Sequence, residues 1–332
     1  MKLIRKLLNG RALRALGVVS AFAMFARGFS QAQAAIPRQP IRLVVPYPTG
    51  AGIDTVARQL AEPLAQQLGQ PVIVDNRGGA NGGIGMEYAA KAPADGHTIV
   101  LALDAQYAIN PNVYKSLPYD PVKDFNPIML IGSVSYVLVT SPQSGIKSAA
   151  DIIDRARKPD QRMNYTGSGV GSGGHMAGAL LESLARVTMT HIPNKSTPSS
   201  LRDVAEGEVQ FVFVTYAASK PLIDAGKLIP IGVSGPKRMA VLPNVPTVAE
   251  SVPGFETVAS YGVFVTAGTP PSTVEKLHAA MGHVMATQAY QQKLAAMGIE
   301  PIGMGPQAFA AQISKDLAKW KAIVTEKGIT VN

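Results

Sequence analysis

Apolar residues along the chain follow two alternating patterns. Short runs rich in β-branched residues predict strands, and stretches of helical period separate them. The predicted strands are IRLVV (41–45), PVIVD (71–75), TIVLAL (98–103), YVLVT (136–140), MTHIP (189–193), VQFVFV (209–214), LIPIGVS (228–234) and YGVFVT (261–266). This alternation predicts an α/β protein with mostly parallel sheets flanked by helices.

The clearest predicted helix follows the first strand. Apolar residues recur at every fourth position from Val56 to Leu68, which predicts one buried stripe. Asp54 suits the N-cap of this helix, and Gly69 suits the residue just past its end. Two further helices are predicted near the C-terminus, within 271–288 and 306–328.

The length of 332 residues is sufficient for two domains. Extended stretches beside turn residues, near 140 and near 260, predict two crossings between them. We therefore expect one lobe made of residues 35–138 and 260–332, and a second lobe made of residues 139–259.

The net charge of +9 comes mainly from the N-terminus. Residues 1–34 carry six basic side chains and no acid. The same segment contains an apolar run and, after it, an A-x-A pattern that ends at Ala34. This predicts a secretory signal peptide, whose removal leaves 25 basic against 22 acidic residues. Without the excess of basic residues, the sequence no longer favours nucleic-acid binding. Because the chain has no cysteine, we expect an exported, non-lipidated protein of the periplasm.

Three predicted strand-to-helix turns are rich in glycine and small polar residues. They are PYPTGAGID (46–54), NRGGANGGIG (76–85) and TGSGVGSGGH (166–175). Such turns lie at the ligand-binding edge of α/β sheets, where helix N-termini present N–H groups to anions. A P-loop lysine is missing, and GAGIDT lacks the third glycine of a dinucleotide fingerprint.

No catalytic or metal-binding constellation emerges from the sequence. The nucleophile-elbow pattern is absent, and the five histidines form no H-x-x-x-H pair. His175 begins a helix beside a glycine-rich turn, where ligand contact and helix capping both remain open. We expect neither a catalytic residue nor a cofactor nor a metal.

These turns resemble those of the Bug/TctC family, the extracytoplasmic solute receptors of tripartite tricarboxylate transporters. IRLVVPYPTGAGIDTVAR is similar to the family's first loop, and PVIVDNRGGANGGIG to its second. AINPNVYKSLPYDPVKDFNPI and GTPPSTVEKL follow in family order. The resemblance implies a two-lobed, Venus-flytrap binding fold of the periplasmic type II class with a two-crossover hinge. A small organic carboxylate would lie in the cleft.

The resemblance also implies the ligand-binding residues. Backbone N–H groups and hydroxyls of two loops would hold the carboxylate, and less constant positions would meet the far end of the ligand. The implied residues are Tyr47, Thr49, Gly50, Ala51 and Asp54 in the first loop, Ser168, Gly169, Gly171, Ser172 and His175 in the second lobe, and Gln106, Asn194, Thr215 and Tyr216 at the far end.

Four positions depart from the family pattern: Ala51, Ile53, Asn194 and Gln210. They predict an altered pocket, and with Tyr47, Ile53 and Tyr216 lining it an aromatic acid is one candidate ligand. Aliphatic di- or tricarboxylates and acidic amino acids are the others. The implied partner is a membrane permease, and we expect a monomer. A receptor for a membrane sensor kinase and, much less favoured, a secreted enzyme are the alternatives.

Overall fold

The structure is a computed structural model that describes residues 39–331. The predicted signal peptide, residues 1–34, lies outside the described residues. Within residues 39–331, no helix has the length and apolar character needed to cross a membrane.

Ten strands form the sheets of the described residues. They are β1 (Ile41–Val45), β2 (Val72–Asn76), β3 (Thr98–Leu103), β4 (Phe125–Thr140), β5 (Asn164–Gly167), β6 (Thr190–Pro193), β7 (Phe211–Thr215), β8 (Ile229–Val233), β9 (Val258–Thr266) and β10 (Glu300–Met304). Every strand predicted from the sequence is present. β5 and β10 were not predicted, because both are short and lack a β-branched run.

The helices of the described residues follow the predicted alternation. They are α2 (Gly52–Leu68), α3 (Gly83–Ala90), α4 (Asn110–Val113), α5 (Ala149–Ala156), α6 (Gly173–Ala185), α7 (Thr197–Ala205), α8 (Tyr216–Asp224), α9 (Pro271–Met285), α10 (Gln288–Ala296) and α11 (Pro306–Lys327). A π-helical turn, Ala105–Ile109, follows β3. The predicted end of α2 is confirmed, since Gly69 has the left-handed φ of 67°.

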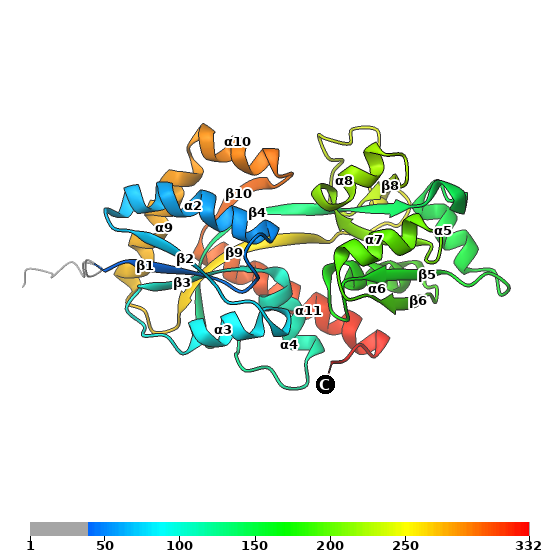
Figure 1. The fold of residues 1–332 in the computed structure, drawn as a ribbon. Helices are drawn as coiled ribbons and strands as arrows, with labels where there is room; N and C mark the ends of the chain where they lie inside the picture. Colours follow the sequence, from blue (N-terminus) through cyan, green and yellow to red (C-terminus); the bar gives the residue numbers. More distant parts are fainter. Residues whose placement is uncertain (1–38, 332) are drawn as a thin grey trace, which may run out of the picture. The chain divides into compact units, whose positions relative to one another are not determined.

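The strand order is β2-β1-β3-β9-β4-β7-β5-β6, and β8 and β10 also pair with β4. The strands form two groups, and Figure 1 shows that β4 belongs to both of them. Up to Ser135 it pairs with β9 and β10, and from Tyr136 it pairs with β7 and β8. We call the first group sheet 1 (β1, β2, β3, β9, β10) and the second sheet 2 (β5, β6, β7, β8).

The α/β class is confirmed, but the expectation of mostly parallel sheets holds only for β1, β2 and β3 and for β5, β6 and β7. β1 is parallel to β2 and β3, and β5 is parallel to β6 and β7. All pairs made by β4 and β9 are antiparallel. Parallel neighbours need a crossover that returns the chain to the same edge. β4 instead continues from one sheet into the other.

β4 is 16 residues long, whereas the sequence predicted a strand only over 136–140. Pro127 and Gly132 interrupt the pattern that would have revealed its first part. The structure accommodates both at register shifts against β9. At Gly132 the lack of a side chain also lets the backbone of Glu300 in β10 approach β4 closely.

Buried apolar side chains cover both faces of sheet 1. The predicted stripe of α2 packs with α9 and α10 on one face, and Val56, Leu60 and Leu64 are fully buried there. On the other face α11 packs with α3 and the π-helical turn, and this cluster continues into α6 beside sheet 2. Trp320 of α11 belongs to this cluster and is 1% exposed.

Candidate functional site

Three glycine-rich loops follow strands and precede helices, as predicted. They are loop 1 (46–51) after β1, loop 2 (77–82) after β2 and loop 3 (168–172) after β5. Because β1 and β2 are parallel neighbours, loops 1 and 2 leave the same edge of sheet 1. This carboxyl edge is where α/β proteins bind ligands.

Loops 1 and 2 touch through glycines. A Cβ atom on Gly78 would lie 2.9 Å from Cδ of Pro48, and one on Gly85 would lie 2.7 Å from Cα of Pro46. Side chains larger than hydrogen would therefore force the two loops apart. The glycines of the second motif serve this close packing.

Asp54 fixes the conformation of loop 1. Its carboxylate accepts hydrogen bonds from the Gly50 N–H (2.9 Å), from Asn76 Nδ2 (3.0 Å) and from Arg58 Nε (3.1 Å), and Asp54 is only 3% exposed. Burial opposes ionisation, but these three hydrogen bonds outweigh it and lower the pKa of Asp54.

The predicted N-cap is wrong by three residues. Ala51 is the N-cap of α2 and has no side-chain capping bond. Asp54 occupies the third helical position and reaches back to loop 1 instead. Its acidic side chain suits either position, since both lie in the positive field of the helix N-terminus.

Gln106 holds Tyr47. Its Nε2 donates to the Tyr47 hydroxyl and to the Asn81 carbonyl, both at 2.9 Å, and its Oε1 accepts from the Leu103 N–H at 3.0 Å. Gln106 is fully buried, so it lies behind Tyr47 rather than on an open surface. Because the Tyr47 oxygen accepts this hydrogen bond, its own hydrogen is left to donate. Burial raises the pKa of Tyr47 to about 12, so the hydroxyl keeps its proton.

His175 shapes loop 3. Its Nδ1 accepts the Gly171 N–H at 3.0 Å, and its own N–H donates to Oγ of Ser172, the N-cap of α6. The imidazole rings of His175 and His191 stack with centroids 3.7 Å apart. Burial, and after it the like charge of His191, lowers the pKa of His175 to about 3. The imidazole therefore stays neutral and Nδ1 stays an acceptor. Gly169, with φ 122°, supplies a backbone conformation that other residues rarely adopt.

Loop 3 and the start of α6 lie against α4 and β4. A Cβ atom on Gly171 would lie 3.2 Å from Cγ1 of Val113 in α4, and one on Gly173 would collide with the Tyr136 hydroxyl of β4. Loop 2 reaches α4 as well, because Asn81 Nδ2 donates to Oδ1 of Asn110 at 2.8 Å. Contacts through loop 2, α4 and β4 thus bring the predicted residues of loops 1 and 3 into one region.

Two helices in this region begin with unused backbone donors. Within residues 39–331, the N–H groups of Gly52 and Ile53 at the start of α2 take part in no hydrogen bond. The same holds for Gly173 and Gly174 at the start of α6. Such orphan donors at helix N-termini bind anions. The Gly50 and Gly171 amides, by contrast, already bind Asp54 and His175.

Comparison with known proteins identifies the family. Residues 56–329 match the family described as "Tripartite tricarboxylate transporter family receptor". The chain belongs to this family. The loop motifs had indicated it, and the family is one of substrate-binding receptors.

Solved structures of similar proteins agree. R. palustris Rpa4515 with adipate is 35% identical, with a TM-score of 0.78 over 89% of this chain and 99% of that one. MatC from Rhodopseudomonas palustris with bound malate is 28% identical, with a TM-score of 0.74 over 87% and 99%. The periplasmic binding protein BugD is 29% identical, with a TM-score of 0.74 over 89% and 99%. The chain therefore has the fold of TctC-type periplasmic binding proteins.

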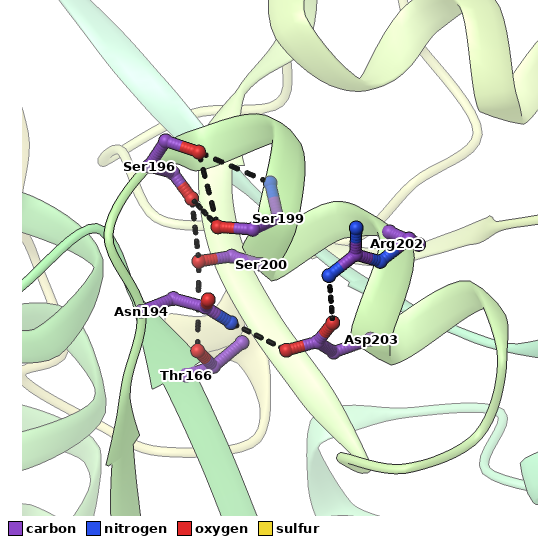
Figure 2. A network of polar contacts seen from close by, with 7 residues as sticks. All are labelled: Thr166, Asn194, Ser196, Ser199, Ser200, Arg202 and Asp203. Carbon is purple, nitrogen blue, oxygen red and sulfur yellow. Dashed lines mark hydrogen bonds and ion pairs between the residues drawn. The ribbon is translucent and has the colours of Figure 1, made fainter.

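The predicted residues Asn194, Thr215 and Tyr216 of this receptor lie in or beside sheet 2. The Asn194 N–H donates to the Gly167 carbonyl just before loop 3, and its side-chain amide donates to Asp203 of α7, as Figure 2 shows. Thr215 lies opposite Tyr136 in the β4–β7 register and is the N-cap of α8, and Tyr216 follows it. Thr49 and Ser168 are exposed on loops 1 and 3.

Two departures from the family pattern have structural roles instead of pocket roles. Ile53 is 3% exposed and packs in the core under α2, so the expectation that it lines the pocket is wrong. Gln210 accepts the Asn164 N–H through Oε1 at 2.8 Å and thereby holds the first residue of β5. The four departures from the family pattern predicted an altered pocket, but the burial of each side chain decides which of them face the pocket.

Sequence reasoning missed three residues of this region. Tyr136 was seen only as the first residue of a strand, and Asn81 and Asn110 were part of motifs with no assigned role. Asn81 has the left-handed φ of 48°, and its carbonyl accepts from both Gln106 and Asn110. Asparagine is among the few residues that tolerate this conformation, a signal that the sequence did contain.

A groove of about 590 Å³ lies elsewhere, between α7, α8 and the turn after β4. It is lined by Ser141, Pro142, Gln143, Pro198, Arg202, Ala205, Glu206, Leu222, Gly226 and Lys227. None of the loop residues takes part in it, so its size does not make it the ligand site. Within the described residues, no three His, Cys, Asp or Glu side chains are grouped to hold a metal ion.

Proposed function

We propose that this receptor captures a small organic carboxylate between loops 1 and 3 and delivers it to a tripartite tricarboxylate-type permease. The observation that carries this proposal is the pair of helix starts, α2 and α6, each with two unused N–H groups. Together with the Tyr47 hydroxyl they offer donors to an anion without any basic side chain.

The ligand class follows from the same donors and from two relatives. Rpa4515 was solved with adipate and MatC with malate, and both ligands are aliphatic dicarboxylates. We propose a dicarboxylate for this chain too. The Ile53 side chain packs in the core, although its backbone N–H faces the proposed anion. This weakens the case for an aromatic acid, because only Tyr47 and Tyr216 of the three proposed lining side chains remain.

The transport cycle we propose uses two lobes, residues 35–138 with 260–332 and residues 139–259, which close on the ligand in the periplasm. The strand that both sheets share, β4, is one of the two connections, and β9 is close to the other. Closure requires that the ligand bind the closed state more tightly than the open one. We propose that the receptor acts as a monomer, without cofactor and without catalysis.

A thermal-shift screen of the purified protein tests this function. Adipate, malate, citrate, glutamate, benzoate and phthalate would each be added at 1 mM. A micromolar site gives about 4 kcal/mol of stabilisation at this concentration, which raises Tm by several degrees. We expect adipate or malate to do so. If no carboxylate raises Tm, even after the protein has been unfolded and refolded to remove any ligand carried through purification, the proposal is wrong.

Replacing Tyr47 with phenylalanine tests the site. The variant loses one hydrogen bond to a charged group, about 1.5–3 kcal/mol, so the Kd of the responding acid should rise about 10- to 100-fold. Gln106 keeps its bond to the Asn81 carbonyl, so the fold should persist. Tyr290→Phe is the matched control, because its buried hydroxyl on α10 has no partner. Equal Kd values for both variants would remove Tyr47 from the site.

A further inference from the structure

Asp104 is a buried acid at the same sheet edge as loop 1. It follows β3 directly, and β3 lies beside β1 in parallel register. The residue is 5% exposed, and its carboxylate accepts the backbone N–H of Ser260 at 3.3 Å. Within the described residues it forms no ion pair with a basic side chain. A buried carboxylate without a cation partner is costly in its charged form.

Titratable groups from several elements interact electrostatically with Asp104. They are Tyr47 of loop 1, Tyr107 of the π-helical turn, Tyr136 of β4, Tyr261 of β9, and Asp316 and Lys319 of α11. Burial is the main influence on Asp104, Asp316 adds a like charge, and Lys319 acts in the opposite direction. Together they raise the pKa of Asp104 to about 7.

Hydrogen bonds and strand register connect Asp104 to the ligand site. Gln106, two residues further along the chain, holds the Tyr47 hydroxyl, and Ser260, which donates to Asp104, pairs with Ser133 of β4, three residues before Tyr136. Burial, and after it the charge of Asp104, raises the pKa values of Tyr47 and Tyr136. Tyr47 belongs to loop 1, and Tyr136 lies against the start of α6. An anion held by these elements would lie within the range of the Asp104 charge, and two negative charges in a buried region repel each other.

We propose that Asp104 carries the proton of the ligand site, so that binding of an organic anion draws one proton from solvent onto the Asp104 carboxyl. This inference rests on the proposed function. The neutral carboxyl removes the repulsion, and the receptor takes up anion and proton together. Asp104 acts here as a specificity-determining residue, since a neutral ligand gains nothing from the proton.

The pH dependence follows from linkage. Well below pH 7 the carboxyl already carries its proton, so anion binding takes up none. Above pH 7 the free protein is ionised at Asp104 and binding must supply the proton. The Kd of an anion should then rise by up to about tenfold per pH unit until the bound form also loses the proton.

Isothermal titration calorimetry of the full protein with adipate, and in parallel with malate, measures this proton directly. At pH 8, titrations in phosphate and Tris buffers, whose ionisation enthalpies differ, give the number of protons taken up. We expect between about half and one proton per ligand at pH 8 and close to none at pH 5. Binding of either acid without proton uptake at pH 8 would overturn the inference and leave the proposed function intact. If neither acid binds in the titrations and no carboxylate responds in the thermal screen, the proposed function and this inference are both overturned.

Two variants identify the group that carries the proton. Asp104→Asn keeps an oxygen for the Ser260 N–H and should bind with a Kd that varies less than twofold between pH 6 and 8, with no proton uptake. Asp316→Asn removes the neighbouring acid of α11 and should retain the uptake. Uptake that persists in Asp104→Asn contradicts the assignment. If Asp104→Asn does not fold, the Asp316→Asn variant decides. Loss of proton uptake in Asp316→Asn would contradict the assignment of the proton to Asp104.

Discussion

Replacing Asp54 with alanine should destabilise the protein by about 3 kcal/mol and raise the Kd of its carboxylate ligand at least tenfold. The carboxylate holds three donors, and the Gly50 N–H and the Asn76 amide are left without a partner when it is removed. Loop 1 would then lose the contacts that fix it over the start of α2. Urea unfolding and calorimetric titration measure the two effects.

Asp151→Ala is the matched control. Asp151 occupies the third position of α5 and accepts the Lys147 N–H at 2.7 Å, the same arrangement as Asp54 with Gly50. It lies outside the three loops, so its loss should cost about 1 kcal/mol and leave ligand affinity unchanged. If the two variants lose the same stability and bind equally well, Asp54 has no special role in loop 1.

The stability difference at Asp54 should also depend on pH. Its pKa in the folded protein is lowered, so its contribution is fully present above the unfolded pKa of about 4. The contribution is lost as the pH falls through the folded pKa. Unfolding of the unmodified protein and of Asp54→Ala should therefore converge in acid.

Replacing Gly178 with alanine should cost about 3 kcal/mol or more, although alanine is the better helix former. Gly178 lies in α6, and a Cβ atom there would come within 2.7 Å of Cζ of Tyr165 and closer still to two other ring atoms. Tyr165 is 1% exposed and stacks on Phe211 with ring centroids 5.6 Å apart, so the ring cannot move aside without disturbing the core.

Gly282→Ala provides the opposite expectation in the same experiment. Gly282 is also inside a helix, α9, but no atom lies within 4 Å of its Cβ position. Here alanine should stabilise the protein by about 0.5–1 kcal/mol. Midpoints of urea unfolding that shift in the same direction for both variants would contradict the packing of Tyr165 on α6.

The Gly178 variant should also weaken ligand binding. Tyr165 stacks on His175 and lies tilted against His191, and His175 accepts the Gly171 N–H that closes loop 3. A displaced Tyr165 ring would move this pair of imidazoles. The effect on Kd therefore reports whether the core of sheet 2 positions loop 3.

Local patterns in the sequence determined much of the fold. The spacing of apolar residues from Val56 to Leu68 fixed which face of α2 is buried, and Gly69 fixed its end. β-Branched runs gave the strands, and glycine-rich turns gave the three loops. These features depend on near neighbours and on φ angles, which the order of residues encodes directly.

The tertiary structure alone decided what the loop residues do. Asp54 was placed at an N-cap, but its partners Gly50, Asn76 and Arg58 assign it to loop 1. Gln106 was predicted to meet the ligand. The structure shows it fully buried with its amide on the Tyr47 hydroxyl, and its contact with a ligand stays a prediction.

The same holds for residues that no local pattern singles out. Tyr136 entered the site through its contact with Gly173. Asp104 entered it through its burial and through the effect of its charge on tyrosines from four elements. Hydrogen-bond partners, burial and electrostatic neighbours arise between residues distant in sequence. Apolar periodicity can predict which element forms, but only the packed fold determines which donors remain free and which acid loses its contact with water.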